Sequence, residues 1–294
     1  MIWKHEGEES MRHFDYACPS SLDEAIALLS GNRKTAKVLG GGTDLLVDLK
    51  TGKHSPSILV SLRKVPGLRG IEKDQNGIRI GACCSLFEVE HSPLVQEKYG
   101  VLSQACSEVG SLQIRCRGTI GGNLCHASPA ADTAAPLLVL HAQLVLRGSK
   151  GERKVEIKDF FAGPGQTVLK EDEILTEIRI PEIEQANKGV YLKLGRRKAM
   201  EIAIAGVAVL ATRDRLSEKI ENVWIGLSSV APTPIRAYEA ESILKGSSVD
   251  EKSIEKTATL ASECSNPITD VRGSKDYRKE MIKVLTRRAL REIL

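Results

Sequence analysis

The sequence lacks several features that would each point to a particular class of protein. Its 294 residues contain no run of about 18 apolar residues, so no membrane span is predicted. No long basic tract is present and the formal net charge is only +4, so nucleic acid is not expected as a partner. The first ten residues have no apolar core. We therefore expect a flexible N-terminal extension over residues 1–10, not a secretory signal.

Cysteine is present, but not in a pattern that a metal site or a disulfide framework requires. The seven cysteines are scattered, their number is odd, and no Cys-x-x-Cys occurs. This usage favours a reducing, cytoplasmic environment. No four-cysteine run resembles the ligand set of an iron–sulfur cluster, so no metal site is expected on this chain. Buried, small apolar side chains are the simpler interpretation of all seven cysteines.

Two common nucleotide-binding signatures are also missing around the glycine turn Gly40–Gly42, which lies between a predicted strand and a predicted helix over Asp44–Lys50. Starting from Gly40, the third glycine of a Gly-x-Gly-x-x-Gly fingerprint would fall at Leu45. No Gly-Lys-Ser/Thr follows, so a Walker loop is excluded. A strand, a glycine turn and a helix can still present main-chain N–H groups to a phosphate. By itself this turn is equally compatible with a purely structural role.

A second glycine segment makes a ligand site the better interpretation. It reads Thr119-Ile-Gly-Gly-Asn-Leu-Cys-His-Ala-Ser-Pro-Ala-Ala-Asp132 and precedes a predicted helix over Ala134–Leu140. Paired glycines allow the backbone to approach a ligand closely. Neither loop core contains lysine or arginine, so N–H groups and hydroxyls must bind an anionic ligand. The alternative role for Asp132 is to cap the following helix, which contributes about 1 kcal/mol.

The rest of the chain predicts a second domain after a polar segment, Glu182–Gly189. Before that segment, a β-hairpin is expected around Gly148-Ser-Lys-Gly151. After it, three strand patterns precede three helical segments, which indicates a compact α+β domain. The second strand pattern, Ile202–Arg213, alternates with one slip. Such a slip suggests either a bulge or a strand buried on both faces.

Together these segments resemble a known family. The stretch Val38-Leu-Gly-Gly-Gly-Thr-Asp-Leu-Leu46 and the segment Thr119–Asp132 are similar to the two FAD-binding signatures of the molybdenum hydroxylases. The chain resembles their separate FAD-binding (medium) subunit, as in bacterial xanthine dehydrogenase and carbon monoxide dehydrogenase. Further matches run to the C-terminus: Phe14-Asp-Tyr-x-x-Pro-x-Ser-Leu-Asp-Glu-Ala25, Gly163-Pro-Gly-Gln-Thr-Val-Leu169, Lys193-Leu-Gly-Arg-Arg-Lys-Ala-Met-Glu-Ile-Ala203 and Ala231-Pro-Thr-Pro-Ile-Arg236.

The resemblance implies an α+β fold with two domains. Residues 11–185 are expected to form a two-lobed FAD-binding domain of the vanillyl-alcohol-oxidase (PCMH) type, with lobes at about 11–62 and 63–185. Residues 190–294 are expected to form the C-terminal domain of molybdenum hydroxylase flavoproteins, built from a three-stranded antiparallel sheet with helices. The cofactor would lie between the two lobes.

The resemblance also implies residue roles. The pyrophosphate-binding loop would comprise Leu39, Gly40, Gly41, Gly42, Thr43, Asp44 and Leu45. Thr119, Gly122 and Asn123 would form the second phosphate-binding segment. Asp132 would bind the adenosine ribose, Lys193 would lie near the flavin ring, and Leu169 would pack on the isoalloxazine or adenine. His126 departs from the threonine familiar in animal members of the family. Some flavoproteins of this broader fold attach FAD covalently through a histidine, but His126 is expected to make a polar contact near the phosphates, with FAD bound noncovalently.

The implied function is electron transfer within an oxidoreductase complex. A large subunit with a molybdenum cofactor would oxidise the substrate, and a small subunit with [2Fe–2S] clusters would pass electrons to FAD. NAD or another acceptor would then take them, and no catalytic side chain on this chain need contact the organic substrate. One rival is a self-sufficient flavin reductase resembling the enolpyruvyl-UDP-sugar reductases, which needs a proton donor that the sequence does not identify. A second rival is an assembly subunit that has lost FAD, which the intact glycine segments oppose.

Overall fold

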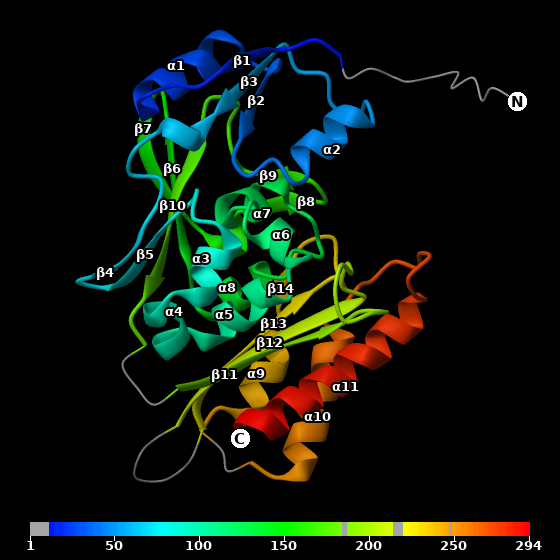
Figure 1. Cartoon of the computed structure of the whole chain (residues 1–294). Helices are drawn as coiled ribbons and strands as arrows, with labels where there is room; N and C mark the ends of the chain where they lie inside the picture. The colour runs from blue at the N-terminus through cyan, green and yellow to red at the C-terminus, as the bar shows by residue number, and fades with distance from the viewer. Residues whose placement is uncertain (1–11, 184–186, 214–219, 247–248) are drawn as a thin grey trace, which may run out of the picture.

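The computed structural model describes residues 12–183, 187–213, 220–246 and 249–294. These ranges form three layers of structure that follow one another from the top to the bottom of Figure 1. A small parallel sheet comes first, then a five-stranded sheet with helices against it, and then a four-stranded sheet backed by the C-terminal helices. None of the helices in these ranges is both long and apolar enough to cross a membrane.

The first layer is a parallel sheet in the order β1-β3-β2. Helix α1 begins after Ser21, whose hydroxyl accepts a hydrogen bond from the N–H of Glu24 and so satisfies one free donor of the first turn. The helix buries Ala25, Ile26 and Leu29 against this sheet. The elements are β1 (Asp15–Ala17), α1 (Leu22–Gly31), β2 (Ala36–Leu39), α2 (Leu45–Lys50), β3 (Ile58–Ser61) and the 3-10 helix η1 (Leu62–Lys64).

The second layer is an antiparallel sheet in the order β4-β5-β10-β6-β7. The expected hairpin is present, with Gly148 paired to Gly151 at its turn. The strands are β4 (Ile71–Asp74), β5 (Gly77–Gly81), β6 (Gln143–Gly148), β7 (Gly151–Glu156) and β10 (Ile174–Pro181), with a separate pair β8 (Phe161–Gly163) and β9 (Gln166–Thr167). The helices are α3 (Leu86–His91), α4 (Pro93–Lys98), α5 (Gly100–Ser107), α6 (Leu112–Arg115), α7 (Ile120–His126), α8 (Ala134–Val139) and the 3-10 helix η2 (Ile157–Asp159).

The C-terminal sheet corrects the expectation of three strands. In the described residues it has four, in the order β11-β12-β13-β14. After the proline-containing turn the chain pairs once more, with Ile235 opposite Leu227. The prolines interrupt the sheet without ending it. The elements are β11 (Asn187–Leu194), β12 (Ala205–Arg213), β13 (Ile220–Ser228), β14 (Ile235–Arg236), α9 (Tyr238–Leu244), α10 (Glu251–Glu263) and α11 (Lys275–Ile293).

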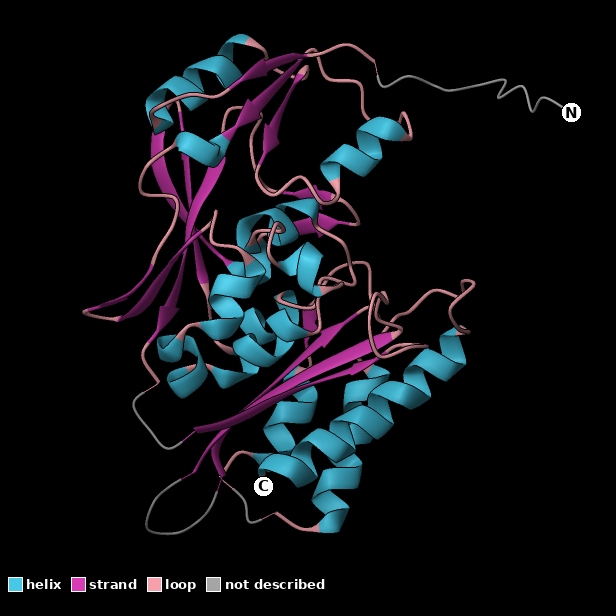
Figure 2. Ribbon diagram, viewed as in Figure 1, coloured by secondary structure: helices cyan, strands magenta, loops and turns pink. Residues whose placement is uncertain are grey.

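The bounds and burial of strand β12 account for the slip in the alternating pattern of Ile202–Arg213. The strand begins at Ala205, so Ile202 precedes it and does not share its alternation. Every residue from Ala205 to Thr212 is buried. The strand contacts α11 and also α8, and Figure 2 shows the sheet lying between the C-terminal helices and the helices of the second layer. Burial on both faces is therefore the correct one of the two interpretations along most of the strand, with a register shift only at Thr212/Arg213.

One hydrophobic core is shared by the second layer and the C-terminal sheet. It contains Leu102 and Leu138 from the helices together with Tyr191 and Leu210 from β11 and β12.

The expectation that all cysteines are buried holds only in part. Cys83, Cys84 and Cys106 are buried, Cys18, Cys125 and Cys264 are partly buried, and Cys116 is exposed, with no disulfide among the seven.

Candidate cofactor-binding cleft

A cavity of about 520 Å³ lies where the first lobe, α7 and the loop before β12 meet. The first lobe contributes the glycine turn after β2, and the C-terminal domain contributes Met200, Glu201 and Ile202. Two of the residues selected from the sequence, Leu39 and Lys193, do not line this cavity. Those that do are Gly40, Gly41, Gly42, Thr43, Asp44, Leu45, Thr119, Gly122, Asn123, His126, Asp132 and Leu169.

The two glycine segments are packed directly against each other, so glycine is required there for more than ligand approach. A Cβ placed on Gly41 would lie 2.0 Å from the carbonyl oxygen of Arg117. A Cβ on Gly121 would lie 2.7 Å from both the Cβ and the carbonyl oxygen of Ala82. These neighbours are backbone or methyl atoms that cannot rotate away. Gly41 and Gly121 therefore permit close packing, of the first turn against Arg117 and of α7 against Ala82.

Four main-chain donors at the start of the second segment, from Ile120 to Asn123, are already used. The N–H groups of Ile120 and Gly121 donate to the carbonyl oxygens of Cys84 (3.0 Å) and Ala82 (2.9 Å). Thr119 accepts from two residues of α7: its hydroxyl oxygen from the N–H of Gly122 (3.0 Å) and its carbonyl oxygen from the N–H of Asn123 (2.9 Å). Thr119 therefore acts as the N-cap of α7. This segment is a scaffold whose side chains, more than its N–H groups, face the cavity.

The first glycine turn differs from the second segment in the state of its main-chain N–H groups. Within the part of the chain that the structure describes, the main-chain N–H groups of Gly41, Gly42, Thr43 and Asp44 donate no hydrogen bond. All four residues line the cavity. Gly42 has a φ of +82°, a left-handed conformation that glycine adopts without strain. Consecutive free N–H groups in such a turn form a concave site for an anion.

Asn123 is oriented by a buried partner. Its Oδ1 accepts a hydrogen bond of 2.6 Å from the hydroxyl of Thr133, which is fully buried. Because the oxygen is held in this way, the amide NH₂ of Asn123 remains as a donor at the cavity wall. His126 is the last residue of α7 and lines the same cavity.

Asp132 lies in a buried polar cluster, where its two oxygens have different partners. Oδ1 accepts a hydrogen bond of 2.7 Å from the Tyr191 hydroxyl, and Oδ2 accepts one of 2.9 Å from Lys193 Nζ. Burial raises the pKa of Asp132, while Lys193 and Tyr191 act against that rise. A carboxylate has about four acceptor positions, so Asp132 retains the capacity to bind a ligand hydroxyl.

These contacts exclude the capping role for Asp132, and they pair two residues that the resemblance assigns to different parts of the cofactor. Asp132 does not cap α8, because the N-cap residue is Thr133 and no side chain makes a capping hydrogen bond there. Lys193 was expected near the flavin and Asp132 at the adenosine ribose. The side chains are paired, however, and the nitrogen of Lys193 is further held by the carbonyl oxygen of Glu108 at 2.8 Å.

Several charged lining residues receive no role from the sequence, although one of them, Glu201, lies in the matched segment Lys193–Ala203. Glu201 is buried and is paired with the exposed Arg197 at 3.1 Å. At another part of the cavity, Glu173 forms a bidentate pair with Arg153, at 2.8 and 2.7 Å, which lowers the pKa of this glutamate. Burial lowers the pKa of His54, which also lines the cavity. A single charged residue carries no pattern, so only the fold could bring these groups together.

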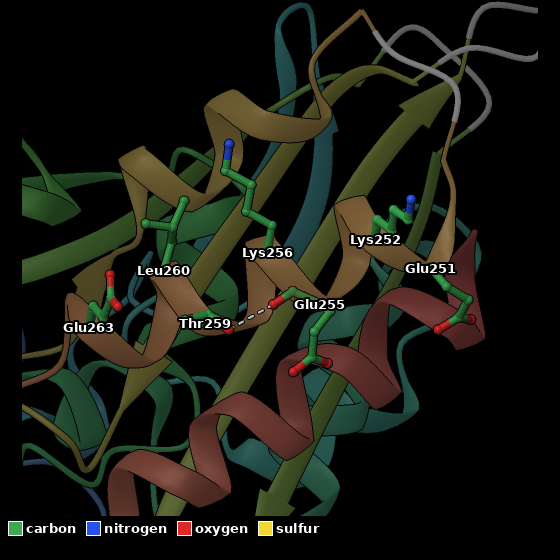
Figure 3. A pocket seen from close by; sticks show the side chains of 7 residues that line it. All are labelled: Glu251, Lys252, Glu255, Lys256, Thr259, Leu260 and Glu263. Carbon is green, nitrogen blue, oxygen red and sulfur yellow. Dashed lines mark hydrogen bonds between the residues drawn. The ribbon is translucent and has the colours of Figure 1, made fainter.

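A second hollow of similar volume, about 540 Å³, lies on the outer face of α10. Figure 3 shows that its seven lining side chains all come from this one helix. Glu255 pairs there with Lys283 and Arg287, and Glu251 pairs with Arg291. Charged side chains on one solvated helix face do not enclose a ligand. The cleft between the lobes is the candidate site.

The chain matches two known families over almost its whole length. Residues 12–183 match the family described as the FAD binding domain in molybdopterin dehydrogenase, and residues 190–293 match the CO dehydrogenase flavoprotein C-terminal domain. The carbon monoxide dehydrogenase medium chain of Hydrogenophaga pseudoflava is 35% identical over 94% of this chain and 96% of its own length. The putative xanthine dehydrogenase FAD-binding subunit of Escherichia coli is 30% identical over 95% and 96%.

Solved structures agree with these relatives. Carbon monoxide dehydrogenase from Hydrogenophaga pseudoflava superposes with a TM-score of 0.92 at 35% identity, covering 95% of this chain and 96% of the other. Quinoline 2-oxidoreductase from Pseudomonas putida superposes with a TM-score of 0.90 at 30% identity, covering 97% and 98%. These matches confirm the fold that the resemblance implied. The chain belongs to the family of FAD-binding medium subunits of the molybdenum hydroxylases and is an oxidoreductase subunit.

Proposed function

We propose that this chain binds FAD noncovalently in the cleft and relays electrons within a molybdenum hydroxylase complex. The electrons would come from [2Fe–2S] clusters on a small partner subunit, which receives them from a molybdenum-cofactor large subunit. They would pass to NAD or another acceptor. The proposal includes a cytoplasmic location and the domain boundaries 11–185 and 190–294. The observation that carries it is the row of N–H groups from Gly41 to Asp44, which lie in the wall of a cavity and donate no hydrogen bond within the described ranges.

The residues present fit a dinucleotide. The N–H groups of Gly41, Gly42, Thr43 and Asp44 would hold the pyrophosphate without a formal positive charge in the turn. The amide of Asn123 would donate to the same phosphates. Asp132 would accept from a sugar hydroxyl, and the half-buried Leu169 would pack on a ring. The two walls are held at a set separation by the contact between Gly41 and Arg117.

Bound FAD supplies a carrier that exchanges electrons singly or in pairs, which suits a junction between iron–sulfur clusters and a two-electron acceptor. The chain's own part is to bind, orient and shield that carrier. No group of three or more metal-ligating side chains lies in the described residues, and the clusters are assigned to the partner subunits. Relatives named as medium chains or FAD-binding subunits support a heteromeric complex.

The rival function is a self-sufficient flavin reductase of the same fold. A reductase needs an acid beside the flavin that can give a proton to a substrate. Lys193 and Tyr191 both donate to Asp132, which we place at a sugar hydroxyl and not beside the flavin, so this cluster does not supply such an acid. The C-terminal match to carbon monoxide dehydrogenase flavoproteins also favours the subunit role.

Purification from the native cell tests the proposal. We expect a yellow protein that copurifies with two further chains and with molybdenum and iron, and that releases FAD into solution on acid precipitation. An isolated chain that reduces a substrate at full rate without partners would overturn the subunit role. A colourless chain that takes up no added FAD, alone or within its complex, would overturn cofactor binding.

A further inference from the structure

We propose that Tyr191 and Lys193 are positioning residues for the cofactor, through which the C-terminal domain controls FAD affinity. They hold the Asp132 carboxylate in its ionised form and aim it at the cleft. The inference rests on the proposed function, because it takes FAD to be the ligand of the cleft. It assigns a role to Tyr191, which does not line the cavity and carries no sequence motif.

The geometry joins two domains at one carboxylate. Tyr191 and Lys193 lie two residues apart on β11, so their side chains emerge from the same face of the strand. That face meets Asp132, which lies just before α8 in the FAD-binding domain. The side chains of Asp132 and Lys193 are only 8% and 5% exposed. Solvent therefore cannot replace either partner of the ion pair if the other is removed.

The strand is fixed in this position by further contacts. The main-chain N–H of Tyr191 donates to Oε1 of Gln104 on α5 at 3.0 Å. On the neighbouring strand β12, Gly206 leaves room for the Tyr191 ring, since a Cβ there would lie 2.8 Å from the hydroxyl oxygen. Lys193 also bridges to the carbonyl oxygen of Glu108 at the C-terminal end of α5. A cation is favoured at that end of a helix.

The ionisation state of Asp132 determines how many hydrogen bonds its carboxyl group can accept. An ionised Asp132 accepts hydrogen bonds from ligand hydroxyls, whereas a protonated one loses acceptor capacity. The groups facing it are Lys193 and Tyr191 from β11 together with Glu108 and Cys106 from the α5 segment. Of these, Lys193 is the one cation, and Glu108 raises the pKa of Asp132 further. Burial and Glu108 both raise the pKa of Asp132, and without Lys193 only the Tyr191 hydroxyl would lower it. Asp132 would then take up a proton at a higher pH.

The test is the pH profile of FAD affinity, measured by quenching of flavin fluorescence on the full chain. We compare the wild type, Lys193→Met, Tyr191→Phe and Asp132→Asn between about pH 6 and about pH 8.5, because buried carboxyl groups can titrate in that range. We expect Lys193→Met to bind at least about tenfold more weakly at the acid end and to recover as the pH rises. Tyr191→Phe should weaken FAD by about tenfold through loss of one charged hydrogen bond. Asp132→Asn should be weak, with no pH dependence.

The outcomes separate this inference from the proposed function. If the wild type takes up no FAD, the proposed function fails. If the wild type binds FAD and Lys193→Met shows a parallel pH profile with the same affinity, the positioning role is overturned. Should Lys193→Met fail to fold, Tyr191→Phe and the charge-neutral double variant Asp132→Asn/Lys193→Met decide. Wild-type FAD affinity in both would overturn the role. Weakened binding by Tyr191→Phe, with a double variant that binds no more weakly than Asp132→Asn alone, supports a role that acts through Asp132.

Discussion

Replacing Gly41 with alanine tests whether the contact between the two glycine segments sets the width of the cleft. The added Cβ would lie 2.0 Å from the carbonyl oxygen of Arg117, and 2.8 Å from both its carbonyl carbon and the Cα of Gly118. Even a tight contact of 3.0 Å would require the segments to separate by about 1 Å, since side-chain rotation cannot relieve a clash between backbone and Cβ.

That separation is large compared with the range of a hydrogen bond. An N–H group at about 2.9 Å from a phosphate oxygen would move to about 3.9 Å, beyond hydrogen-bond range. Loss of two such bonds to a charged group, at about 1.5–3 kcal/mol each, corresponds to FAD binding weakened by at least about 100-fold. Titration of the FAD-free protein with FAD, followed by flavin fluorescence, measures this loss.

Two other glycines provide matched controls. Gly31 is in the same lobe, and a Cβ there would meet nothing within 4 Å. Gly31→Ala should therefore leave FAD affinity unchanged and alter the unfolding free energy by no more than about 1 kcal/mol. Gly40 is intermediate, since its Cβ would lie 3.1 Å from the hydroxyl oxygen of Thr119. If Gly41→Ala bound FAD as tightly as Gly31→Ala does, the width of the cleft would not depend on this contact.

Three further predictions concern attachment of the cofactor, a buried ion pair and acid stability. Acid precipitation should release all the flavin into the supernatant; flavin retained on the protein, but not on His126→Ala, would show a covalent link. Arg236→Met should lower the unfolding free energy by about 3–5 kcal/mol in chemical denaturation, because Glu241 would stay largely buried without its guanidinium partner at 2.6 Å, and an unchanged denaturation midpoint would contradict this. Arg153 lowers the pKa of Glu173 below its ordinary value of 4.5, so this pair stabilises the fold above that pH and the gain is lost as the pH falls through the lowered pKa. In acid denaturation, Arg153→Gln should lose less unfolding free energy than the wild type as the pH falls below that value. An equally steep loss in both proteins would show that the Arg153–Glu173 pair does not cause it.

Local pattern was enough to place the elements that carry the cleft. The turn at Gly40–Gly42, the hairpin at Gly148–Gly151 and the helix after Asp132 all occur near the positions predicted. Each depends on residues close in sequence, such as glycines that permit a turn or a hydroxyl that caps a helix. The family resemblance depends on the same short segments, which explains why it could be recognised without a structure.

Other features depended on packing between distant segments. Sequence spacing could not show that Tyr191 and Lys193, 59 and 61 residues from Asp132, donate to its two oxygens. Nor could it show that Gly41 contacts Arg117, or that Met200 and Ile202 reach the cavity from the C-terminal domain. Two-residue β14 was missed because so short a strand has no alternation to detect.

Sequence alone determined the two glycine segments, their order and the family they indicate, because turn chemistry and helix capping act over a few residues. The tertiary structure decided which groups in those segments are free. It shows that the N–H groups from Ile120 to Asn123 are already bonded, whereas those of Gly41–Asp44 donate no hydrogen bond to any residue that the structure describes. It also shows that Asp132 is held by β11 instead of capping α8. The physical reason is that a donor or a carboxylate has only a few bonding positions, and the fold determines which of them are filled.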